Sequence, residues 1–138
     1  MAEVSLTGGS VFSYVWLALL FSAVLVAAGL ALARRLTRYA VAGPSMEPAL
    51  HDGDWLIVDR QAFRRRPPRL GVGVVFRDPP GAPRESVKRV TGQTDPGWYL
   101  VEGDNPDHSI DSRQFGPVGR DAILGRAVAR YWPSPRRL

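Results

Sequence analysis

One lysine stands among the basic residues of this chain. Of 18 Lys and Arg side chains, only Lys88, in the stretch SVKRV at residues 86–90, is a lysine. Arginine keeps its proton at any accessible pH, whereas a buried lysine can lose its proton and act as a base or nucleophile. Because neighbours alternate across a strand, either Lys88 or Arg89 faces inward, and the side chain that can become neutral is the better candidate. The pattern predicts a base at Lys88; the alternative is a lysine that reaches water from a strand edge.

A serine between a Gly-Pro pair and a second proline could serve such a base. Ser45 lies in GPSMEPAL, residues 43–50, where proline restricts the backbone and would hold a hydroxyl at a fixed angle. Taken alone, such a cluster is more often a plain turn. A serine hydroxyl becomes an effective nucleophile when a neighbouring base takes its proton, and Ser/Lys pairs are one known arrangement. The base would need its pKa lowered from about 10.4 toward about 7 to 8.

A third polar segment, GDNPDHSIDSRQFGPV, covers residues 103–118. Its short polar side chains are also typical of a solvated loop that hydrogen-bonds its own backbone. Asp111 and Arg113 are two residues apart, so in an extended segment they share a face and could form an ion pair or a bridge to Arg89. We expect the only histidines, His51 and His108, to be structural rather than members of a histidine triad.

The elements that must position these residues begin with an apolar segment. Residues 11–33 carry no charged side chain and are long enough for a transmembrane helix. A cleaved secretory signal would have a basic start and a shorter apolar region, whereas Glu3 is the one charged side chain in the first ten residues. We therefore expect a tail over residues 1–10, a transmembrane helix over 11–33, a basic linker over 34–40 and a catalytic domain over 41–138.

The remaining sequence has the texture of a compact, mainly β fold. Short apolar runs alternate with Gly, Pro and Asp, and no segment is periodic enough for a second helix. Strands are predicted over residues 55–58, 72–76, 87–90, 98–101 and 123–131.

The cysteine content and the net charge exclude some kinds of site and disfavour others. Without cysteine, neither a disulfide framework nor a cysteine metal site is possible. The formal charge of +5 comes from scattered arginines without a recognisable nucleic-acid-binding motif, so membrane lipid is a better partner for this charge than nucleic acid. The oligomeric state stays open.

Taken together, the three polar segments resemble the bacterial-type signal peptidase I family, membrane-bound serine peptidases with a Ser/Lys dyad. The likeness lies in GPSMEP-L, VKRV and GDNPDHSIDSRQFGPV, in this order after an apolar anchor. It implies a signal-peptidase-like β fold behind one N-terminal transmembrane helix. It also implies protein or peptide substrates with an N-terminal leader, and neither a cofactor nor a metal.

The resemblance also implies residue roles. Ser45 would be the nucleophile and Lys88 the general base, while Ser109 would orient the lysine amine. Asp111, Arg113 and Arg89 would form a supporting ion-pair network. The Ser45 backbone N–H would contribute to the oxyanion hole, to which Gly43 has no hydroxyl to add. Only residues 91–97 and one strand separate the second and third motifs, which indicates a near-minimal catalytic core.

The side of the membrane and the type of substrate stay open. Family members act outside the cytoplasmic membrane, but Arg34, Arg35 and Arg38 follow the apolar segment, and the positive-inside rule then favours a cytoplasmic domain. The small size and the closing RYWP resemble short actinobacterial-type peptidases linked to maturation of nickel superoxide dismutase, a cytoplasmic precursor. Other candidates are a self-cleaving repressor, although a hydrophobic segment replaces its DNA-binding region, and a non-catalytic membrane-tethered binding module.

Overall fold

The computed structural model describes residues 8–79 and 84–138, with side chains from residue 12. The pattern of residue contacts divides the chain into two units, one ending at Arg34 and one covering Arg35–Leu138. Helix α1, Gly8–Arg35, lies in the first unit except for Arg35, its last residue, which belongs to the second. Within the described residues, the segment Phe12–Arg35 is the one helix long and apolar enough to cross a membrane. The predicted tail lies outside the described residues up to residue 7, and α1 begins at Gly8.

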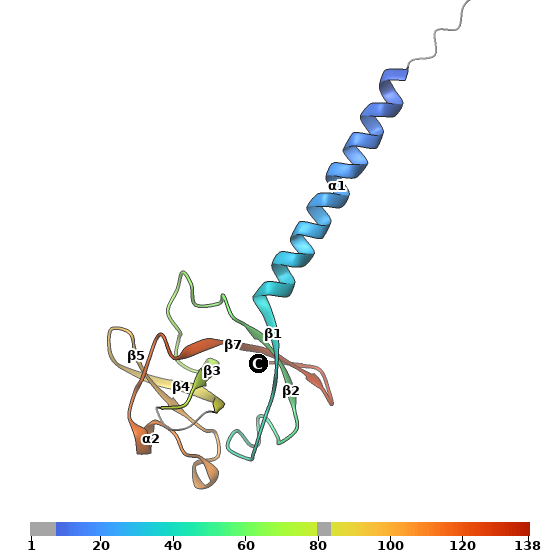
Figure 1. Cartoon of the computed structure of the whole chain (residues 1–138). Coiled ribbons are helices and arrows are strands. Elements are labelled where there is room, and N and C mark those ends of the chain that lie inside the picture. The colour runs from blue at the N-terminus through green and yellow to red at the C-terminus, as the bar shows by residue number, and fades with distance from the viewer. Residues whose placement is uncertain (1–7, 80–83) are drawn as a thin grey trace, which may run out of the picture. The chain divides into compact units, whose positions relative to one another are not determined.

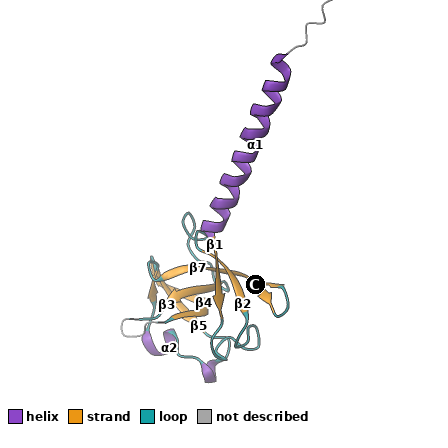
Figure 2. Ribbon diagram, turned by 45° about the vertical axis from the view of Figure 1, so that its right-hand side comes forward, coloured by secondary structure: helices purple, strands orange, loops and turns teal. Residues whose placement is uncertain are grey.

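The second unit is an antiparallel sheet, seen in two views in Figures 1 and 2. Its path runs β1-β2-β7-β3-β4-β5-β6, and β8 pairs with β7. All five predicted strands are present, which confirms the mainly β fold. The strands are β1 (Leu36–Ala40), β2 (Trp55–Asp59), β3 (Gly73–Arg77), β4 (Glu85–Asp95), β5 (Trp98–Glu102), β6 (Val118–Gly119), β7 (Ile123–Trp132) and β8 (Arg136–Arg137).

The segment that the sequence suggested as a linker has regular structure. Arg34 and Arg35 complete α1, and Leu36–Ala40 forms β1, paired with β2 from Leu36↔Asp59 to Ala40↔Trp55. Tyr39 packs against the core while Arg38 is exposed. The sequence did not predict this strand because Arg38 and the other residues of its solvated face interrupt any apolar run.

Four short elements were also not predicted from the sequence. They are β6, β8, a 3-10 turn at Pro106–His108 and helix α2, Ser112–Phe115. Each is four residues or fewer, so neither helical nor strand periodicity can develop within it.

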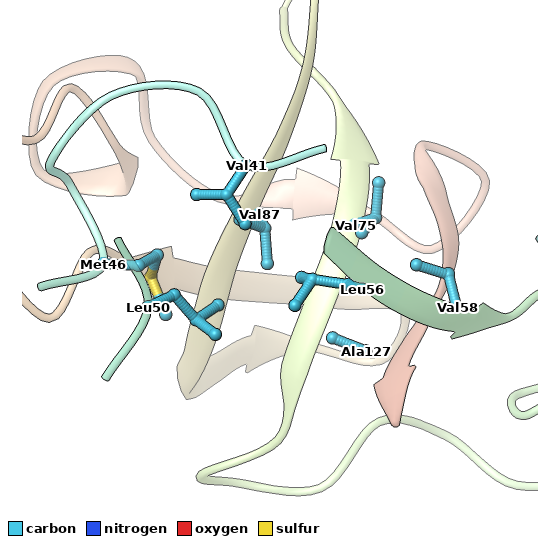
Figure 3. Packing of buried hydrophobic residues seen from close by; sticks show 8 residues of the cluster. All are labelled: Val41, Met46, Leu50, Leu56, Val58, Val75, Val87 and Ala127. Carbon is cyan, nitrogen blue, oxygen red and sulfur yellow. The ribbon is translucent and has the colours of Figure 1, made fainter. Parts of the chain in front are cut away.

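Two hydrophobic clusters stabilise the sheet. Figure 3 shows the first, in which side chains from the loop before β2 meet β2, β3, β4 and β7. It comprises Val41, Met46, Leu50, Leu56, Val58, Val75, Val87 and Ala127. The second comprises Phe63, Val74, Phe76, Val90, Tyr99, Val101, Val118 and Ile123. Strands β3 and β4 supply residues to both clusters, so β4 carries apolar side chains on both faces, as expected for a central strand.

Candidate active site

Ser45 lies in the loop between β1 and β2, and apolar neighbours fix this loop. Met46 and Leu50 are almost fully buried in the first cluster (Figure 3), and the Leu50 amide donates to the Met46 carbonyl over 2.8 Å. Gly43 has φ +82°, a conformation that L side chains rarely adopt, and its amide donates to Asp52 Oδ1. Ser45 is thereby held half-buried beside the core.

A buried ion pair closes the base of this loop. Asp54 Oδ2 accepts hydrogen bonds from the His51 amide and from Arg130 Nη1 of β7, each 2.9 Å long. Burial raises the pKa of Asp54, but these two donors outweigh it and lower the pKa below its ordinary value. The side chains of His51 and His108 are exposed, so neither resembles the buried base of a triad.

Lys88 lies on β4 and is 4% exposed, whereas Arg89 is half-buried on the other face. Lys88 is paired in register with Val74, which belongs to the second cluster. Burial in these apolar surroundings lowers the pKa of Lys88, against the opposing fields of Asp111 and Asp78. The fold therefore favours the neutral amine more than water does.

The structure brings the two predicted catalytic side chains into contact. Lys88 Nζ and Ser45 Oγ are hydrogen-bonded at 2.5 Å, although the residues are 43 positions apart in the chain. A serine hydroxyl within hydrogen-bond reach of a base that can be neutral meets the geometric requirement for nucleophile activation. The Ser45 backbone N–H makes no hydrogen bond within residues 8–79 and 84–138, so it remains able to donate to an oxyanion.

Asp111 organises the third polar segment. It is fully buried, accepts from Ser109 Oγ at 2.6 Å and the Gly103 amide at 2.8 Å, and forms a two-pronged ion pair with Arg113. It also caps α2, where its amide donates to Gln114 Oε1. Burial opposes ionisation, but the bonds from Arg113, Gly103 and Ser109 together hold the pKa of Asp111 far below its ordinary value. The carboxylate is therefore a fixed charge near Lys88.

Two expected contacts differ in the structure. Arg89 does not join Asp111; it forms a two-pronged pair with Asp104, with Nε–Oδ1 2.8 Å and Nη2–Oδ2 2.6 Å. Arg89 faces away from Lys88, so a carboxylate on its own side of the strand satisfies it. The Ser109 hydroxyl donates to Asp111, and no hydrogen bond joins Ser109 to Lys88 in the described part of the chain.

Gly103 and Asn105 tie the third segment to the Ser45 loop. The Asn105 amide donates to the Ser45 carbonyl at 3.0 Å, and its side chain donates to the Pro44 carbonyl at 3.1 Å. A Cβ added to Gly103 would lie 2.3 Å from Ser109 Oγ and 2.5 Å from the Ser45 carbonyl oxygen. Sequence reasoning gave neither residue a role; the Gly-Asp-Asn run after a strand was the available signal.

One edge of β4 stays open beside Lys88. Val90 exchanges backbone hydrogen bonds with Gly71 and Val72 on the β3 side, so alternation directs the backbone groups of Val87 to the opposite side. Pairing with β5 begins only at Arg89. On this edge the Glu85 carbonyl accepts from the Tyr39 hydroxyl at 2.7 Å, and no strand within the described residues pairs with Val87 there.

Comparisons with known proteins agree with one another. The family model described as "Signal peptidase, peptidase S26" matches residues 13–95 and 92–132. Mitochondrial ATP-independent inner membrane protease subunit 1b of Arabidopsis thaliana is 36% identical over 66% of this chain and 67% of the relative. Probable signal peptidase I-2 of Synechocystis sp. is 30% identical over 88% and 75%. Mitochondrial inner membrane protease subunit 1 of Schizosaccharomyces pombe is 33% identical over 67% and 71%.

Proposed function

Because this chain belongs to the signal peptidase family, peptidase S26, we propose that it is a membrane-anchored serine endopeptidase that removes N-terminal leader segments from proteins. The relatives include proteins named signal peptidase and inner membrane protease. The observation that carries the catalytic assignment is the 2.5 Å contact between Lys88 Nζ and Ser45 Oγ.

In the proposed acylation step, neutral Lys88 takes the proton from Ser45 as Oγ attacks the carbonyl carbon of the scissile bond. The carbonyl oxygen becomes an oxyanion, to which the Ser45 amide donates. The C–N bond then breaks as Lys88 passes the proton to the leaving amine. An ester to Ser45 remains, and the mature protein leaves with a free N-terminus.

Deacylation repeats the proton transfers with water. Lys88 takes a proton from a water molecule that attacks the ester carbonyl, and the C–O bond to Ser45 breaks as Oγ regains a proton. Asp111 acts as a positioning residue: it fixes Ser109 and Gly103, and Gly103 closely approaches the Ser45 loop. Arg113 completes the ion pair that keeps this carboxylate in place.

The open edge of β4 suggests how a leader would be held. Val87 precedes Lys88 and has backbone groups without a strand partner on this side. An extended peptide can add to such an edge through main-chain hydrogen bonds, with its side chains alternating between the two faces. In this position the peptide backbone would run toward Ser45.

The first test is substitution of the two catalytic candidates. Ser45→Ala removes the nucleophile, and Lys88→Arg preserves charge while removing basicity. We expect the N-terminus of the native substrate to stay unprocessed in cells that carry either variant, as measured by quantitative N-terminal peptide mass spectrometry against the wild-type gene. Arg60→Lys is an exposed control outside the site.

The outcomes separate the candidate functions. Processing that survives Lys88→Arg would contradict the dyad. Unchanged N-termini across the proteome after gene inactivation would favour the non-catalytic binding module. Circular dichroism of the purified variants distinguishes lost chemistry from lost folding.

A cytoplasmic precursor is the second candidate substrate class. Arg34, Arg35 and Arg38 at the end of the span favour a cytoplasmic catalytic unit, where a substrate such as nickel superoxide dismutase would reside. Protection of a C-terminal tag from protease in intact spheroplasts is expected for this class, whereas digestion is expected for an enzyme that processes exported proteins.

A further inference from the structure

The loop between β2 and β3 carries the densest positive charge of the catalytic unit. Arg64, Arg65 and Arg66 follow one another, and together with Arg35, Gln61 and Ala62 they line a recess of about 340 Å³. Among the described residues only Arg35 of these arginines has a carboxylate partner, Asp59. The recess thus presents three guanidinium groups without an ion pair in the part of the chain that the structure describes.

Buried residues hold this loop at both ends. Phe63 is packed in the second cluster, with the Arg120 guanidinium over its ring at 5.5 Å, and Pro68 is buried. The residues between them, 64–67, are all exposed. The arginines therefore lie on a loop whose two ends are fixed. This lowers the entropic cost of ordering the loop when a ligand binds.

The recess is tied to the residue at which the candidate membrane span ends. Arg35 is the last residue of that span. Its carbonyl accepts from the Arg60 amide at 2.9 Å, and its guanidinium binds Asp59. Four residues of chain reach about 14 Å at most, so Arg64 cannot lie farther than this from Arg60. When the span crosses a membrane, the arginines lie near its surface.

We propose that this recess binds the phosphate of an anionic membrane phospholipid. Arginine suits the partner because its planar fork matches phosphate oxygens. Basic residues that lie next to a membrane surface are attracted to its anionic phospholipid headgroups. The contact fixes the catalytic unit against the membrane by a second attachment besides α1, and it is independent of the peptidase reaction.

The absence of cysteine permits a direct test on the full chain. Leu70 is 68% exposed and belongs to the same loop without lining the recess. A fluorophore on Leu70→Cys, in nanodiscs that contain headgroup-spin-labelled phosphatidylcholine, reports loop–lipid proximity by quenching. We expect quenching to increase when phosphatidylglycerol replaces part of the phosphatidylcholine, and to disappear at about 0.5 M salt, where the Debye length falls to about 4 Å.

Two double variants that each remove two positive charges test whether the recess is the lipid site. Arg64→Gln with Arg65→Gln removes two neighbouring charges from the recess, and Arg136→Gln with Arg137→Gln removes two exposed neighbouring charges elsewhere. Since each arginine near an anionic surface strengthens attraction about fivefold, the first variant is expected to lose the phosphatidylglycerol-dependent quenching and the second to keep it. Equal loss in both, or retention in the first, would overturn the site.

Other ligands give different outcomes. Inorganic phosphate added to pure phosphatidylcholine nanodiscs is expected to leave the fluorescence unchanged; a saturable response would assign the recess to a soluble anion. Binding of polyglutamate by a protein that shows no phosphatidylglycerol response would assign it to an acidic polypeptide. Either result contradicts the lipid assignment.

Discussion

Lys88 is a buried ionisable side chain, and charged groups of both signs lie near it. Burial lowers its pKa, Asp111 and Asp78 raise it, and Arg113 lowers it. The only lysine in the chain is therefore placed where a proton can be lost, a property that arginine cannot supply. The nearby Asp111 carboxyl keeps its charge across the working pH range, because its own pKa is held low.

The pH dependence of cleavage follows from the sign of this shift. Only neutral Lys88 accepts a proton, so kcat/KM is expected to rise with pH through a lowered lysine pKa. Asp111 stays ionised over this pH range, so it adds no second titration step to the profile. Single-turnover cleavage of the native precursor at a series of pH values measures the profile; a flat profile from roughly pH 5 to 9 would contradict Lys88 as the base.

Substitution of Asp111 separates its field from its hydrogen bonds. Asp111→Asn removes a charge that raises the pKa of Lys88 and leaves Arg113, which lowers it, without its partner. We expect the rising limb of the pH profile to move to lower pH. Asparagine also leaves the Ser109 hydroxyl and the Gly103 amide with one acceptor oxygen in place of two, so we expect a loss of about 1 to 3 kcal/mol in unfolding free energy, measured by urea denaturation.

Asp107→Asn is the matched control, since Asp107 is exposed in the same segment. It should leave both the stability and the pH profile nearly unchanged. A shift of the Asp111→Asn profile to higher pH would show that the field of Asp111 does not govern Lys88.

Among the elements, two loops meet a central strand. The β1–β2 loop presents Ser45, β4 presents Lys88, and the segment after β5 supplies Asp111. Gly103 allows the second loop to approach the first, because its missing side chain leaves room for Ser109 and for the Ser45 carbonyl. The distance between Ser45 Oγ and Lys88 Nζ thus depends on how the two loops pack against each other.

Gly103→Ala tests this packing. The added methyl group would overlap Ser109 Oγ and the Ser45 carbonyl oxygen, so we expect a loss of about 1 to 3 kcal/mol in unfolding free energy together with a large fall in kcat. Gly73→Ala is the control, since its Cβ would lie 3.5 Å from Ala127 Cβ, an ordinary contact. Equal activity of the two variants would contradict a positioning role for Gly103.

For the whole molecule, the membrane span and the catalytic unit have separate requirements. Both hydrophobic clusters consist of residues after Arg35. The sheet therefore forms its core from residues of its own unit. The span attaches the protein to the membrane, while the sheet unit positions Ser45 and Lys88.

A chain reduced to residues 35–138 is expected to fold by itself. It keeps Arg35, whose ion pair with Asp59 and backbone bond to Arg60 extend the pairing of β1 with β2 at its end. A cooperative urea transition with the same dependence on Asp111→Asn as the full chain is the expected result. A non-cooperative transition would show that the helix contributes to the core.

The sequence alone located the apolar segment and the five main strands, and its three polar motifs carried the resemblance to the family. The apolar segment, the five main strands and the three polar motifs are local patterns, so they can be read from neighbouring residues. The lone lysine and the proline-bounded serine already indicated a base and a nucleophile. Strand β1 was not recognised, because its one basic residue, Arg38, is solvated and its pairing partner, β2, is distant along the chain.

Only the tertiary structure decided which groups meet. The 2.5 Å contact of Ser45 with Lys88 and the pairing of Arg89 with Asp104 rather than Asp111 join residues far apart in the chain. So does the fit of Gly103 between Ser45 and Ser109. Burial is likewise a property of the folded sheet. Sequence spacing establishes which side chains share a face of one strand, but it cannot say which loop packs above that face or how much water the packing excludes.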